Sequence, residues 1–140
     1  MECPSRGLFS QLLAALDELL SLETLLSSQS YLVKSRARIK AREVAQRAAT
    51  LCKCLLEAMR RSEVCSHTFE EYKELVEKGE KAIKSTASKL GVSLGSGPLV
   101  RPRRVTLSLL EVGLGYVECR KVEPAVRDLC NALEVFASVI

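Results

Sequence analysis

Basic side chains are the largest group in this 140-residue sequence that could do chemistry, and most of them lie in one segment. Between Ser30 and Arg61 there are nine Lys or Arg but only two Glu, which gives the segment a net charge of +7. Clustered cations bind phosphate backbones through counterion release and need no base-reading motif. The sequence therefore offers nine candidate contacts for nucleic acid or an acidic partner, in the segment 34–47 and in a later loop: Lys34, Arg36, Arg38, Lys40, Arg42, Arg47, Arg101, Arg103 and Arg104.

The same segment carries an apolar stripe. Its members recur at alternating steps of three and four residues, which places them on one helical face that other helices must cover. They are Val33, Ala37, Ala41, Val44, Ala48, Leu51, Leu55 and Ala58. On a helical wheel, Arg36, Lys40 and Arg47 flank one side of this stripe, whereas Lys34, Arg38 and Arg42 flank the other. Charges that frame a buried seam are typical of a bundle helix, and residues 1–29, with a net charge of −3, provide an acidic segment to complement it.

The chain length and the apolar periodicity predict one all-α domain, a bundle of four or five helices with one long central helix. Residues 1–90 form a three-helix part, with helices at 5–27, 30–63 and 68–90. Residues 91–104 contain three Gly, two Pro and three Arg, and predict a flexible loop. Residues 105–140 then form a helical hairpin, with a stripe of Val126, Leu129, Leu133, Phe136 and Ile140 on its last helix.

Local signals set several of these boundaries. Thr68 and Glu71 have the spacing of a capping box, and Gly91 is placed to end the same helix as a C-terminal cap. Gly79, in the middle of that helix, indicates either a bend or close contact with a neighbour. Pro124 is expected in the first turn of the last helix.

The six cysteines are Cys3, Cys52, Cys54, Cys65, Cys119 and Cys130. The amino-terminal segment fits an amphipathic helix better than a signal peptide, so we expect a cytoplasmic protein whose cysteines are small buried hydrophobic residues. Disulfides become the expectation if the source is a hyperthermophile. Cys52 and Cys54 point about 200° apart on a helix and cannot grip one ion, so neither a metal nor a cofactor is expected. No run is long enough to span a membrane.

Small and aromatic residues near the carboxyl end follow a known pattern. Val112 and Gly113 take the place of a Leu-Gly pair, Tyr116 takes a Tyr position, and Ala125 and Ala132 take two small positions. With these residues, the segment 106–139 resembles one helical hairpin of the tetratricopeptide type. The resemblance implies a surface that binds a peptide or a helix of another protein.

The hypothesis of a catalytic function rests on two residues. Arg61 and His67, on an all-helical chain of this size, are similar to the Arg and His motif of the HEPN ribonucleases. The resemblance implies RNA cleavage at a dimer groove, with Arg61 stabilising phosphate charge and His67 assisting proton transfer. A nucleophilic pair of Cys65 and His67 lacks an identified orienting group, and no phosphate-binding glycine motif is present.

Taken together, these patterns favour a non-enzymatic interaction or assembly module that binds a protein partner, or itself, through apolar helix stripes. The alternative is an accessory protein that binds nucleic acid through the basic helix and Arg101–Arg104. The HEPN-like ribonuclease is a minor alternative. No membrane partner is expected.

Overall fold

The computed structural model describes residues 3–4, 6–62, 65, 67–94 and 117–140. The helices in these ranges are α1 (Leu8–Ser21), α2 (Glu23–Leu26), α3 (Tyr31–Arg60), α4 (Phe69–Leu90) and α6 (Cys119–Val139). The four long helices pack together, and the 30-residue α3 is central among them. The prediction of an all-α bundle around one long helix is confirmed.

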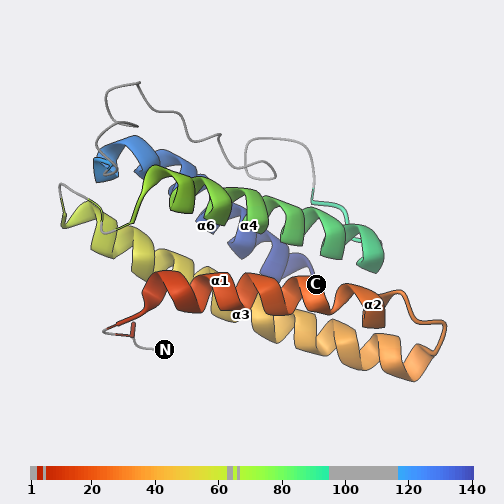
Figure 1. Cartoon of the computed structure of the whole chain (residues 1–140). Coiled ribbons are helices and arrows are strands. Elements are labelled where there is room, and N and C mark those ends of the chain that lie inside the picture. Colours follow the sequence, from red (N-terminus) through yellow and green to blue (C-terminus); the bar gives the residue numbers. More distant parts are fainter. Residues whose placement is uncertain (1–2, 5, 63–64, 66, 95–116) are drawn as a thin grey trace.

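The four long helices close a ring around a shared core. In Figure 1, α1 lies against α3, α3 against α6, α6 against α4, and α4 against α1. α3 runs antiparallel to the other three, and the short α2 packs beside α3 and α4. The start of α3, α2 and the end of α4 therefore lie at one end of the bundle, and the end of α3 lies at the other.

The predicted stripe of α3 forms its buried face. Its six inner members are buried: Ala37, Ala41, Val44, Ala48, Leu51 and Leu55. The two end members are not, since Val33 is 37% exposed and Ala58 is also exposed. The alanines let the neighbouring helices approach closely, and the first turn of α3 lies outside the core. All five predicted stripe residues of α6 are buried, from Val126 to Ile140.

The predicted caps of α4 are present. The Glu71 backbone N–H donates to Thr68 Oγ1 at 3.2 Å, and the Thr68 N–H donates to Glu71 Oε1 at 3.0 Å, which completes the capping box. Gly91 ends the helix in the left-handed conformation, with φ 66°. At the start of α3, Ser30 caps the helix by accepting from the Val33 N–H.

Two predicted helix boundaries need correction. The helix expected at 5–27 is interrupted at Leu22, where the backbone N–H bonds to Leu19 at 3.2 Å in a tightened turn. The turn allows both Leu22 and Leu26 to reach the core. The helix expected at 30–63 ends at Arg60.

The predicted start of the last helix at Pro124 is wrong. α6 begins five residues earlier, at Cys119, and Pro124 lies inside it. Cys119 and Val122 are buried and continue the stripe of the helix by steps of three and four, so packing sustains the turn that precedes the proline. The first helix of the predicted hairpin falls mainly on residues outside the described ranges, and the tetratricopeptide-type resemblance stays a prediction.

Candidate functional site

Three of the predicted basic residues are engaged within the bundle. Lys40 and Arg47 both form ion pairs with Glu18 of α1, the former at 3.5 Å. Arg42 donates from Nε to the main-chain oxygen of Ile140 at 2.9 Å. Complementarity between the acidic first helix and the basic α3, one of the two uses predicted for these charges, therefore holds at Lys40 and Arg47.

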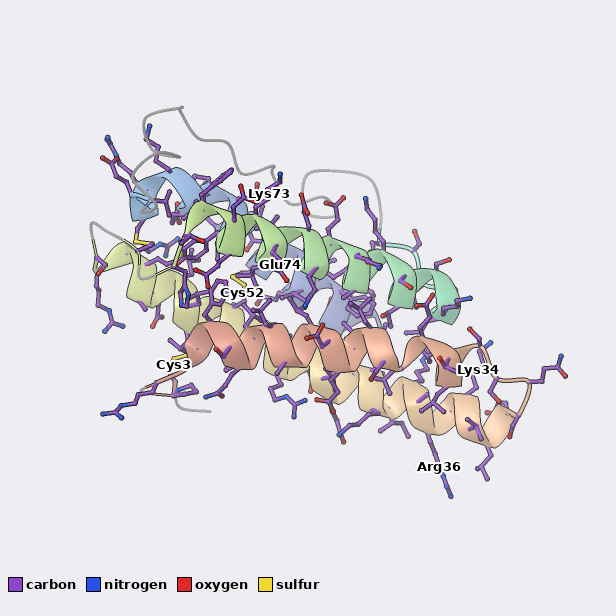
Figure 2. The ribbon with its side chains drawn as sticks, viewed as in Figure 1. Cys3, Lys34, Arg36, Cys52, Lys73 and Glu74 are labelled. Atoms are coloured by element: carbon purple, nitrogen blue, oxygen red, sulfur yellow. A yellow bond between two sulfur atoms is a disulfide. The ribbon has the colours of Figure 1, made fainter. Side chains whose placement is uncertain are left out.

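The other three predicted cations of α3 are exposed and form no ion pair with any described residue: Lys34, Arg36 and Arg38. They lie in the first turns of the helix, at the end of the bundle formed by α2 and the end of α4. In Figure 2, the Arg36 side chain points away from the other helices. Arg101, Arg103 and Arg104 lie outside the described residues.

Large apolar side chains are exposed among these cations. Tyr31 is 85% exposed, Leu32 is 60% exposed and Ile39 is 61% exposed. Burying the exposed part of Leu32 or of Ile39 against a partner would contribute roughly 1–2 kcal/mol. We call the six residues Tyr31, Leu32, Lys34, Arg36, Arg38 and Ile39 the α3 tip surface.

Leu32 and Ile39 were not among the predicted contacts, because both lie off the buried stripe. Their signal was nevertheless in the sequence, since two large apolar residues seven positions apart share one face of a helix. A cavity of about 360 Å³ adjoins the α3 tip surface. It is lined by Tyr31, Lys34, Ser35 and Arg38 from α3 and by Leu90 from α4.

A matched pair of triple variants tests the distinction between the α3 cations that are engaged within the bundle and those that are exposed. Lys40→Ala/Arg42→Ala/Arg47→Ala should lower the free energy of unfolding by about 1–2 kcal/mol, because it removes two ion pairs and a hydrogen bond between helices. Lys34→Ala/Arg36→Ala/Arg38→Ala should change it by less than about 0.5 kcal/mol. Urea titrations followed by circular dichroism measure both values. An equal loss in the two variants would contradict the distinction.

A second cavity, of about 400 Å³, lies between the end of α3 and the start of α6. Its arginines are held by carboxylates that belong to the bundle. Glu123 accepts from Arg60 at 3.2 and 3.3 Å and pairs with Arg127 at 3.8 Å, and Arg120 Nε lies 2.6 Å from Glu118. The cavity is lined by Met59, Arg60, Ser62, Cys119, Arg120, Glu123 and Arg127. These carboxylates partly neutralise the positive charge of the arginines, which makes the cavity a weaker candidate binding site than the α3 tip surface.

All six cysteines lie in the described part of the chain and are paired. The disulfides are Cys3–Cys54, Cys52–Cys130 and Cys65–Cys119, with Cα–Cα distances of 5.6, 5.4 and 5.0 Å. Five of the six are buried, as predicted, and the pairing is the disulfide alternative that the sequence left open. Both half-cystines of α3 lie in its second half, so the disulfides crosslink the end of the bundle opposite the α3 tip surface.

The two residues of the predicted catalytic pair each contact other side chains of the chain. His67 stacks on Phe9 with ring centroids 4.0 Å apart, and its Nδ1 lies 3.3 Å from Glu71. Arg61 instead pairs with Glu57 at 3.7 Å. The Thr68 backbone hydrogen bond and the His67 side chain lower the pKa of Glu71, which also belongs to the capping box. Cys65 is held in a disulfide and is not a nucleophile in this state. The HEPN-type resemblance stays a prediction.

Tyr72, beside this cluster, gives a pH-dependent prediction. Burial raises its pKa from 10.0 to about 12. Between these values the unfolded chain loses the phenolic proton and the folded chain keeps it, so stability should fall as pH rises above about 10. Urea unfolding at pH 9 and pH 11 measures the loss, and Tyr72→Phe should make it less steep. An identical pH dependence in the two proteins would contradict this account.

Among the described residues, no group of His, Cys, Asp and Glu has the arrangement of a metal site. Nor does any helix in the described ranges have the length and apolarity needed to cross a membrane. Comparison of the chain with protein-family models, curated proteins and solved structures found no match.

Proposed function

We propose that this protein is a non-enzymatic interaction module whose disulfide-crosslinked helical bundle presents the α3 tip surface to a protein partner. The observation that carries the proposal is the combination of exposed apolar residues, Leu32 and Ile39, with three cations that have no ionic partner in the described chain. The buried centres of interfaces are more apolar than the rest of a protein surface and are rich in aromatic side chains and in arginine.

The core supports the same proposal. The apolar stripes of α3 and α6 are used within the chain, so binding through those stripes would require the bundle to open. The first turns of α3 are different, because their large apolar side chains are already exposed. We therefore place the interaction predicted from the helix stripes at the α3 tip surface.

Three disulfides favour an oxidising compartment over the cytoplasm as the place of action. The alternative is the cytoplasm of a hyperthermophile, where intracellular disulfides are common. Alkylation of free thiols in protein taken directly from its source, followed by mass spectrometry, tests this. The proposal requires no alkylated cysteine, and six alkylated cysteines would contradict it.

The second candidate function, nucleic-acid binding, is favoured by Lys34, Arg36 and Arg38, three exposed cations that have no ionic partner among the described residues. Its electrostatic footprint is smaller than the sequence predicted, because Lys40, Arg42 and Arg47 are engaged inside the bundle. Each phosphate contact contributes about −0.9 to the slope of log K against log salt for duplex DNA. A slope of about −3 that disappears in Lys34→Ala/Arg36→Ala/Arg38→Ala would support this function. No binding to DNA or RNA at low salt would exclude it.

The proposed function is tested with crosslinking in the native source. The parent, Leu32→Glu/Ile39→Glu and the control Lys73→Glu/Lys81→Glu on the exposed face of α4 are compared. We expect a defined crosslinked complex with the parent and the control that is lost in the Leu32→Glu/Ile39→Glu variant, while all three proteins keep the same helicity. Equal crosslinking of all three would contradict the proposal.

A further inference from the structure

We infer that the partner of the α3 tip surface is an acidic amphipathic helix, whose apolar seam covers Leu32 and Ile39 and whose carboxylates pair with Arg36 and Arg38. The inference rests on the proposed function and names the chemistry of its partner. It follows from three features of the first turns of α3: the order of side chains around the helix, the sign of the charges, and the shape of the adjoining surface.

The order of side chains resembles a short coiled-coil seam. Leu32 and Ile39 occupy equivalent positions one heptad apart, and Ser35 lies between them on the same face, where its small side chain permits close approach. Arg36 and Arg38 then lie on opposite flanks of this face. In two-stranded coiled coils, residues on these flanks form interhelical ion pairs and decide which partner binds.

The sign of the charge selects an acidic partner. From Tyr31 to Arg42 the helix carries five cations and no carboxylate. A second copy of this chain, laid against the same face, would bring Arg36 and Arg38 close to like charges, which opposes association. Carboxylates on both flanks of a partner helix would pair with these arginines without breaking any ion pair of the bundle.

The apolar side chains and the cavity argue against the other anionic partners. A nucleic acid would leave Leu32 and Ile39 in water and would find only Tyr31 for stacking. An anionic bilayer binds in proportion to buried apolar area, and two aliphatic side chains give it little. The 360 Å³ cavity lined in part by Arg38 and Leu90 is large enough to hold a side chain from a partner helix.

The probe is a synthetic peptide of three heptads with Leu at the two seam positions and Glu on both flanks, labelled for fluorescence anisotropy. One control peptide has Lys on the flanks, and a second has Ser at the seam. We expect the parent to bind the first peptide at least tenfold more tightly than either control, and to bind it more weakly at 0.5 M than at 0.05 M salt.

Three variants assign the contacts. Arg36→Glu/Arg38→Glu should weaken binding of the acidic peptide at least tenfold and improve binding of the Lys-flanked peptide. Leu32→Ala/Ile39→Ala should weaken binding at least tenfold, since two apolar contacts are lost. Lys73→Glu/Lys81→Glu, the matched charge reversal on α4, should leave the affinity unchanged.

The inference is overturned if the parent binds the Glu-flanked and the Lys-flanked peptides with equal affinity. It is also overturned if the parent binds phosphatidylserine vesicles or single-stranded DNA but does not bind the acidic peptide. It is also overturned if light scattering shows a dimer that Leu32→Glu/Ile39→Glu converts to a monomer. In that last case the proposed function survives with a second copy as partner. If crosslinking in the native source is also unchanged by Leu32→Glu/Ile39→Glu, both the proposed function and this inference fail.

Discussion

Replacing Cys52 and Cys130 with alanine is expected to lower the free energy of unfolding by about 3–4 kcal/mol. The disulfide joins α3 to α6 across 78 residues of sequence, and it removes more chain entropy from the unfolded state than a crosslink between near neighbours would. Both sulfurs are buried, so each replacement also leaves a small space in the core. Guanidinium titrations of the oxidised proteins measure the difference.

The control for this disulfide is chemical reduction. A reductant should destabilise the parent by more than it destabilises Cys52→Ala/Cys130→Ala, because the parent has one additional crosslink to lose. Figure 2 shows Cys52 on the inner side of α3, whereas Cys3 lies at the start of the chain. If the double variant and the parent had the same stability under oxidising conditions, the disulfide would not contribute to the fold.

Gly79→Ala is expected to destabilise the protein by about 1–3 kcal/mol, although alanine is the better helix former by about 1 kcal/mol. A Cβ atom at Gly79 would lie 3.1 Å from Leu129 Cδ2 and would overlap Cδ1 of the same side chain. Leu129 is fully buried in α6, so its side chain would have to shift within the packed core to admit the Cβ atom. The close contact of α4 with α6 therefore outweighs helix propensity.

A double-mutant cycle isolates this contact. Leu129→Ala alone should cost about 2–5 kcal/mol through the cavity that it leaves. In that background, Gly79→Ala should become neutral or stabilising, because the overlap is gone and the propensity gain remains. Equal effects of Gly79→Ala in the parent and in Leu129→Ala would contradict a steric role for the glycine.

Much of the fold could be predicted because its determinants are local. The capping box at Thr68 and the left-handed Gly91 depend on residues within one turn, and the stripe of α3 depends on helical periodicity alone. The close contact at Gly79, one of the two explanations predicted, is also confirmed. The start of α6 was predicted wrongly because proline is typical of the first turn of a helix. Here Pro124 lies inside α6, which begins earlier because its first turn is packed against the core.

The pairing of the cysteines depends on which helices are neighbours, and periodicity does not give that. The divergent directions of Cys52 and Cys54 on a helix were nevertheless predicted, and each pairs with a different cysteine. The sequence could show that the two residues need different partners. It could not show that α6 lies beside α3.

The candidate site was only partly predictable for a similar reason. A helical wheel assigns the cations of α3 to two flanks around the helix axis. In the structure, the cations differ by their position along the axis: those near the start of α3 are exposed, and those further along are engaged within the bundle. Arg36 and Lys40 share a flank on the wheel, yet Arg36, near the start of α3, pairs with no described residue, whereas Lys40 reaches Glu18. The length of the neighbouring helices decides which turns of α3 are covered, and no local signal encodes it.

Amide hydrogen exchange with and without the acidic peptide tests most directly the claim that one end of α3 is the binding surface and the rest of the helix is core. We expect slower exchange on peptide binding in residues 31–42, and unchanged exchange in the second half of α3 and in α6. Slower exchange centred on α4 or α6, with residues 31–42 unchanged, would contradict the claim.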